Sequence, residues 1–238
     1  MGGPAREFSK TAGDLLSRAR DSSMEVRQQG LADLCRTYWK PIYSQLRMAW
    51  NKSNEDAKDL TQAFLLWLVE GDALRRYAPE RASFRTYLKT LLKHFVQHQE
   101  TALHRLKRGG GIQILSMNLE VGPLEEVLRD SRGVDPERVF DRVWMTDLVQ
   151  RAVGRVGARF RSSGRTLPFQ VFEAYDGASG KQPTYALLAE RLGIKESDVT
   201  NHLYSVREAI RAEIKSELSG MTTSPEELEE EWNAFLKH

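Results

Sequence analysis

Apolar residues recur at every third or fourth position along most of this chain, and this spacing is the feature that most limits its fold. Between residues 24 and 50 the repeat consists of Leu31, Leu34, Tyr38, Ile42 and Leu46. This period places apolar side chains on one face of an α-helix. The sequence shows no strand-rich region and no internal repeat, so it predicts an all-α protein.

Local signals indicate where further helices begin and end. Ser53 predicts an N-cap followed by acidic residues in the first turn, and Gly71 predicts the end of that helix near Glu70. A third helix is expected from residue 82 or 83 to about Arg108, where three glycines interrupt it.

A stretch containing several glycines and prolines, residues 109–135, predicts a linker between two helical domains. A short helix at 123–129 is compatible with this linker. The expected division is an N-terminal extension at 1–23, a first domain at 24–108, a second domain at 136–216, and an acidic helical extension at 217–238.

Charge is distributed unevenly, although the net charge is only +2. Nine Lys or Arg residues lie between 75 and 108, against two Glu, whereas five Glu residues lie between 226 and 231. A local excess of positive charge favours a polyanionic partner. The basic segment is therefore a candidate nucleic-acid surface.

The lack of long apolar segments and the single cysteine exclude several classes of protein. No apolar run approaches the roughly 20 residues of a membrane span, and no apolar secretory segment is visible near the N-terminus. The single cysteine, Cys35, excludes an intrachain disulfide, and its neighbours favour a buried small hydrophobe. We expect a cytoplasmic protein with no membrane partner.

A helix-turn-helix is predicted near residues 184–207. Thr184 can cap a first helix, Ala189 is small enough for a crossing helix, and Gly193 can adopt the positive φ of a tight turn. Leu188, Leu192, Ile194 and Val199 would fill the space between the two helices. Polar residues on the outside of the second helix could reach base edges and phosphates: Lys195, Ser197, Thr200, Asn201, Tyr204, Ser205 and Arg207.

The segment after residue 82 interleaves aromatic and basic residues. Such a segment can stack bases on its rings and hold phosphates with its cations, as single-stranded DNA binding requires. The alternative is that Phe84, Tyr87 and Leu88 form part of a hydrophobic core while the lysines are solvated. Both interpretations remain open from the sequence.

Several motifs together resemble bacterial extracytoplasmic-function (ECF) sigma factors. Residues 31–43 look like the start of sigma region 2, and Asp-Ala-Lys-Asp-Leu-Thr-Gln at 56–62 is similar to the family's core-binding motif. Phe-Arg-Thr-Tyr-Leu at 84–88 resembles its promoter-reading segment, and the helix-turn-helix matches region 4. Arg-Gly-Gly-Gly at 108–111 is similar to a subgroup with a long linker and a C-terminal extension.

The resemblance implies a role for each part of the chain. Residues implied to bind core RNA polymerase are Asp56, Asp59, Leu60, Gln62 and Phe64. Residues implied to read and open the −10 element as single-stranded DNA are Phe84, Arg85, Tyr87, Lys89, Lys93, His94, Arg105, Lys107 and Arg108. The helix-turn-helix residues named above would read the duplex −35 element. No catalytic residue, cofactor or metal is implied, because the polymerase performs the chemistry.

Alternatives to this interpretation are a stand-alone helix-turn-helix regulator, a metal pair at His94 and His98, and acid–base catalysis by Asp56 and Asp59. Neither pair has the accompanying ligands or nucleophile that its chemistry needs. The sequence also leaves open control by an anti-sigma factor or a regulatory kinase.

The acidic tail begins with a strong helix start, in which Ser224 is the cap and Pro225 occupies the first helical position. An apolar stripe then follows, formed by Leu228, Trp232, Phe235 and Leu236. So short a helix needs something to pack against. The tail could extend the core of the second domain, or its acidic face could lie near the DNA-binding surface and restrain the free protein.

Overall fold

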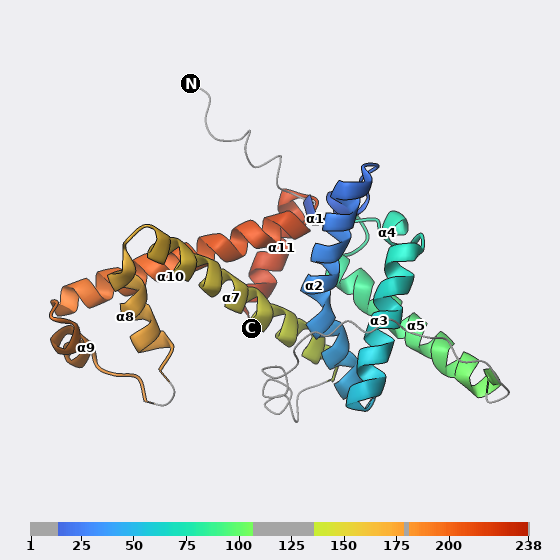
Figure 1. Cartoon of the computed structure of the whole chain (residues 1–238), viewed down its shortest axis with the longest axis horizontal. Helices are drawn as coiled ribbons and strands as arrows, with labels where there is room; N and C mark the ends of the chain where they lie inside the picture. The colour runs from blue at the N-terminus through green and yellow to red at the C-terminus, as the bar shows by residue number, and fades with distance from the viewer. Residues whose placement is uncertain (1–13, 107–135, 179–180, 238) are drawn as a thin grey trace, which may run out of the picture. The chain divides into compact units, whose positions relative to one another are not determined.

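The computed structural model describes residues 14–106, 136–178 and 181–237, and every regular element in these ranges is an α-helix (Figure 1). The all-α prediction is confirmed for this part of the chain. None of its helices combines the length and apolar character needed to cross a membrane.

The described chain forms two compact units, one made of residues up to 145 together with those from 218 onward, and one made of residues 146–217. Helices of the first unit are α1 (Asp14–Ala19), α2 (Met24–Ala49), α3 (Asn54–Glu70), α4 (Ala73–Arg76), α5 (Phe84–Leu106) and α11 (Pro225–Leu236). The second unit contains α8 (Thr166–Asp176) and α9 (Tyr185–Leu192). Two long helices, α7 (Pro136–Ser162) and α10 (Glu196–Met221), contribute to both units.

This division differs from the expected domain boundaries. The sequence-based division places residues 136–145 in the second domain, whereas the structure groups them with the first unit. The predicted linker at 109–135, with its short helix at 123–129, lies outside the described residues. Two domains joined by a linker therefore remain a prediction.

The predicted helix ends agree closely with the structure. The Ser53 hydroxyl accepts a hydrogen bond from the Asp56 amide at 3.1 Å, and the Gly71 amide donates to the Trp67 carbonyl at 3.0 Å. The Ser224 hydroxyl accepts from the Glu227 amide at 3.2 Å. Each cap pairs a backbone group that the helix itself leaves unpaired.

The first unit has its core between α2, α3 and α5. Helices α2 and α3 run antiparallel beside one another (Figure 1). The α2 repeat predicted from sequence supplies fully buried Leu34, Ile42 and Leu46, and Phe64 of α3 and Leu88 of α5 are fully buried as well. Cys35 is half-buried, and burial raises the pKa of its thiol, as expected for a packed rather than a reactive side chain.

One glycine allows α1 to pack closely on α2. A Cβ added to Gly30 would lie 2.4 Å from the Ala19 amide nitrogen, closer than real atoms approach. Any larger residue at position 30 would push the two helices apart.

The second unit has a separate core, and its α7 and α10 segments lie side by side. Val171, Leu188, Val199 and Leu203 are almost fully buried. Arginines of α7 pair with carboxylates of α10: Arg155 Nε lies 2.8 Å from Glu213 Oε1, and Arg151 Nη2 lies 2.6 Å from Glu217 Oε1.

Candidate nucleic-acid interface

Helix α3 presents an exposed face that combines acidic and apolar residues. Asp56 and Asp59 are exposed, and Leu66 and Trp67 are exposed over 55% and 41% of their surface although they are large and apolar. Helical spacing places these residues, with Glu70, on one side of α3. Leu60 and Gln62 are half-buried, whereas Phe64 is fully buried in the core. Among the residues that the resemblance assigned to polymerase binding, Phe64 thus has a packing role in this structure.

The aromatic residues at the start of α5 also face the core. Phe84 is 3% exposed and makes edge contacts with the rings of Tyr38 and Tyr77, at centroid distances of 5.5 and 5.2 Å. The Tyr87 hydroxyl donates to the Ala73 carbonyl at 2.8 Å. These contacts match the core interpretation of Phe84 and Leu88, and they leave Tyr87 half-buried.

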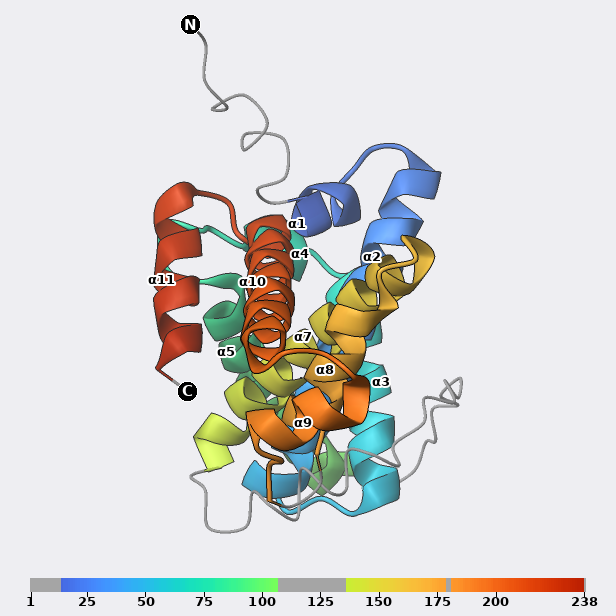
Figure 2. The ribbon, with the colours of Figure 1, turned by 90° about the vertical axis from the view of Figure 1, so that its left-hand side faces the viewer.

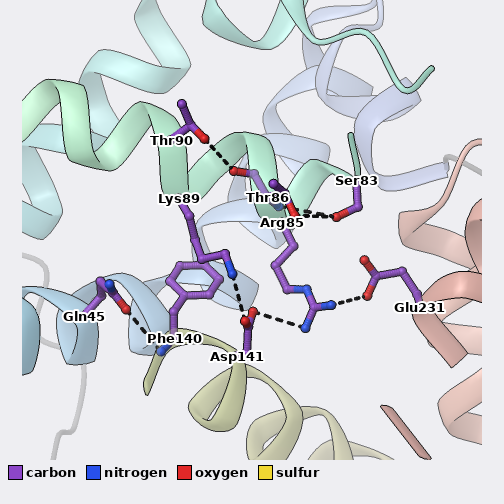
Figure 3. Close-up of polar contacts among 9 residues, drawn as sticks. All are labelled: Gln45, Ser83, Arg85, Thr86, Lys89, Thr90, Phe140, Asp141 and Glu231. Carbon is purple, nitrogen blue, oxygen red and sulfur yellow. Dashed lines mark hydrogen bonds and ion pairs between the residues drawn. The ribbon is translucent and has the colours of Figure 1, made fainter. Parts of the chain in front are cut away.

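Arg85 and Lys89 lie one turn apart on α5, and both contact carboxylates (Figure 3). Lys89 Nζ lies 2.8 Å from Asp141 Oδ2, and Arg85 Nη1 lies 3.2 Å from Asp141 Oδ1. Arg85 Nη2 lies 2.7 Å from Glu231 Oε2 of α11, and its guanidinium lies 4.7 Å from the Trp144 ring centroid. We call Arg85, Lys89, Asp141 and Glu231 the α5 charge cluster.

Further along α5, basic and imidazole side chains are exposed. They are Lys93, His94 and His98. Arg75, Arg76 and Arg81, which precede α5, are exposed as well. Arg105 lies in α5, but its side chain is outside the described residues, as are Lys107 and Arg108. The first unit therefore exposes several basic side chains before and along α5, whereas Arg85 and Lys89 are paired within the α5 charge cluster.

The helix-turn-helix of the second unit has the predicted geometry. The Thr184 hydroxyl accepts from the Leu187 amide at 3.2 Å, and Gly193 has a φ of +65°. Leu188 and Val199 are buried, and Leu192 and Ile194 pack against them. The outer side of α10 exposes Ser197, Thr200, Asn201 and Tyr204, with Lys195 exposed just before the helix and Ser205 half-buried.

Arg207 differs from the other predicted residues of this face because it is held by a carboxylate. Its Nε and Nη2 donate to Asp176 Oδ2 and Oδ1 at 3.0 and 2.8 Å, and its guanidinium lies 5.7 Å from the Tyr175 ring centroid. The hydrogen bonds to Asp176 raise the pKa of Arg207. A bidentate pair of this kind fixes the orientation of the guanidinium.

The sequence did not reveal the carboxylates that position these arginines. Asp141, Glu231 and Asp176 lie 31 or more residues from their partners in the chain. The one available signal was the run of Glu residues in the tail, for which contact with the DNA-binding surface was one of two interpretations left open.

The structure offers little support for metal binding. Within the part of the chain that it describes, no group of three or more His, Cys, Asp or Glu residues could hold a metal ion. His94 and His98 are exposed on α5 without a third ligand of this kind.

Comparison with known proteins adds no further assignment. No family model, no curated protein and no solved structure matches this chain.

Proposed function

We propose that this protein is a sigma factor of the ECF-like type, which binds core RNA polymerase and directs it to promoters. The observation that carries this proposal is the pairing, in one chain, of a helix-turn-helix with an exposed polar face and a separate unit with an exposed acidic and apolar face on α3. A stand-alone regulator needs the first feature but does not need an acidic face for docking on polymerase.

The proposal gives each surface a physical task. Asp56 and Asp59, beside Leu66 and Trp67, suit docking on a basic protein surface, because apolar contact supplies affinity and the carboxylates supply specificity. The exposed residues of α10 suit the major groove of the −35 element. The basic residues around α5 suit the single-stranded −10 element. The polymerase performs the chemistry, and this chain selects the site.

The test is run-off transcription with purified bacterial core polymerase and a library of upstream DNA fragments. The protein should yield promoter-specific transcripts that core polymerase alone does not produce. A stand-alone regulator would bind DNA but yield no specific transcript with core polymerase, and that result would overturn the proposal.

Asp59→Ala should weaken polymerase binding by roughly 1–3 kcal/mol, because one charge of the docking face is lost. Glu80→Ala is the matched control, since Glu80 is also exposed and carries the same charge but lies outside α3. Competition against a labelled reference sigma factor measures both affinities. Equal affinity of the two variants would show that the α3 face does not dock on polymerase.

A further inference from the structure

The α5 charge cluster is largely shielded from solvent although it is built from four charged groups, of which Lys89 is the most exposed at 28%. The side chains of Arg85 and Glu231 are 11% and 10% exposed, and that of Asp141 is 19% exposed. They come from three different helices, α5, α7 and α11 (Figure 3). Helix α11 lies alongside the start of α5, as Figures 1 and 2 both show.

Stability alone does not explain this cluster. Desolvation of two charges offsets most of their attraction, so a buried ion pair is weak evidence for stabilisation. The cluster is also incompletely bonded: among the residues that the structure describes, Arg85 Nε and Trp144 Nε1 are buried without a hydrogen-bond partner. An arrangement with unmet hydrogen bonds suits an exchangeable contact better than a permanent one.

The cavity beside Arg85 is too small to admit DNA. Its volume is about 10 Å³, and its lining includes Arg85, Trp144, Glu227 and Glu231. This is about the space that one water molecule needs. A phosphate or a base can therefore reach the Arg85 guanidinium only if α11 moves.

Helix α11 is held by few groups. Leu228 and Glu231 are its buried residues, and the Tyr77 hydroxyl donates to Glu227 Oε1 at 3.1 Å. Trp232 and Phe235 are half-buried, and Leu236 is 60% exposed. A helix of 12 residues has little stability of its own, so loss of these contacts would release it.

We propose that α11 is an internal competitor of nucleic acid: the Glu231 carboxylate takes the place of a DNA phosphate on Arg85, and α11 must lift from α5 before single-stranded DNA binds there. The inference rests on the proposed function in one respect, namely that the basic residues of α5 bind DNA. It adds a closed state of the free protein that promoter engagement must open.

The test compares Glu231→Gln with Glu230→Gln in the full chain. Both substitutions remove one negative charge from α11, but Glu230 is exposed and makes no contact with the cluster in the described structure, whereas Glu231 pairs with Arg85. The probe is a fluorescent thymine oligonucleotide, and the readout is its binding affinity across a range of salt concentrations. Thermal melting confirms that each variant is folded.

Glu231→Gln should bind the oligonucleotide several-fold more tightly than Glu230→Gln. Its salt dependence should steepen by about 0.7 in log–log slope, because Arg85 gains one phosphate contact. Adding Arg85→Gln to Glu231→Gln should abolish both gains. Asp141→Asn, which releases Arg85 and Lys89 from the other side, should also increase binding and serves if Glu231→Gln fails to fold.

Equal affinities and slopes for Glu231→Gln and Glu230→Gln would overturn the inference, as would a gain that persists without Arg85. Run-off transcription separates this failure from failure of the proposed function. Specific transcripts without a binding gain would refute the closed state alone. A binding gain without transcripts would leave the closed state standing and refute the sigma-factor assignment.

Discussion

Asp176 makes Arg207 unlike the exposed polar residues on the outer side of α10. The Asp176 carboxylate accepts hydrogen bonds from Arg207 Nη2 at 2.8 Å and from Arg207 Nε at 3.0 Å. The negative charge of Asp176 therefore offsets much of the positive charge of Arg207. Asn201 and Tyr204, by contrast, are exposed on the outer side of α10. The two kinds of environment predict two kinds of DNA contact.

We expect Asn201→Ala to change base preference at one position of the −35 element and to cost about 1–3 kcal/mol on the preferred sequence. Arg207→Ala should instead weaken binding to all sequences and lower the salt slope, because Asp176 fixes the guanidinium through Nε and Nη2 and we expect its remaining N–H groups to contact a phosphate. A series of single-base promoter variants, measured by gel shift at several salt concentrations, checks both. Loss of preference at one base in Arg207→Ala would show a direct base contact instead.

At the scale of elements, local chemistry made most helices predictable. Ser53, Thr184 and Ser224 each have a side-chain oxygen that accepts from a backbone amide, and Gly193 ends α9 with a left-handed φ. These signals act within a few residues, so the sequence carries them directly. Helix α8 was not predicted, and in the structure no capping side chain marks its start at Thr166.

Two glycines in the second unit provide a matched test of the turn in the helix-turn-helix. Gly193 has a φ of +65° and Gly154 lies inside α7, and an added Cβ would meet nothing within 4 Å at either position. Gly193→Ala should destabilise the second unit by roughly 1 kcal/mol through backbone strain. Gly154→Ala should stabilise it by roughly 0.5–1 kcal/mol through higher helix propensity.

Chemical denaturation measures the two glycine variants on the same scale, because both residues belong to the unit at 146–217. Stabilisation by Gly193→Ala would mean that the turn does not have this left-handed conformation in solution. The strain would also displace the outer side of α10, which we propose to bind the −35 element. Binding of that element should therefore fall in Gly193→Ala and remain unchanged in Gly154→Ala.

At the scale of the whole molecule, the sequence predicted which faces are charged but not which faces meet. Helical periodicity defines an apolar side for each helix, and it carries no information on partners 50 or 150 residues away. The pairs Lys89–Asp141 and Tyr77–Glu227 are of this kind. For the same reason the segment 136–145 was assigned to the second domain, although its Asp141 and Trp144 pack in the first unit.

The same limit applies to the acidic tail, for which the sequence left two interpretations open. In the structure, Leu228 of α11 is buried, but α11 belongs to the first unit and not to the second domain as the packing interpretation expected, and Glu231 contacts Arg85. The packing of α11 and its proposed restraint of DNA binding therefore involve the same helix, and separate experiments are needed to distinguish them.

Deleting residues 224–238 should both destabilise the first unit and increase its binding to single-stranded DNA. Loss of the buried Leu228 alone is worth roughly 2 kcal/mol, and the truncation also removes the hydrogen bond from the Tyr77 hydroxyl to Glu227, so the melting temperature should fall. Arg85 loses one of its two carboxylates but keeps Asp141.

Leu228→Ala in the full chain is the control for this truncation, because it weakens the packing of α11 while retaining Glu231. Thermal melting and oligonucleotide binding should give lower stability for both proteins and the larger binding gain for the truncation. A fall in melting temperature with no binding gain in the truncation would show that α11 serves only to complete the core.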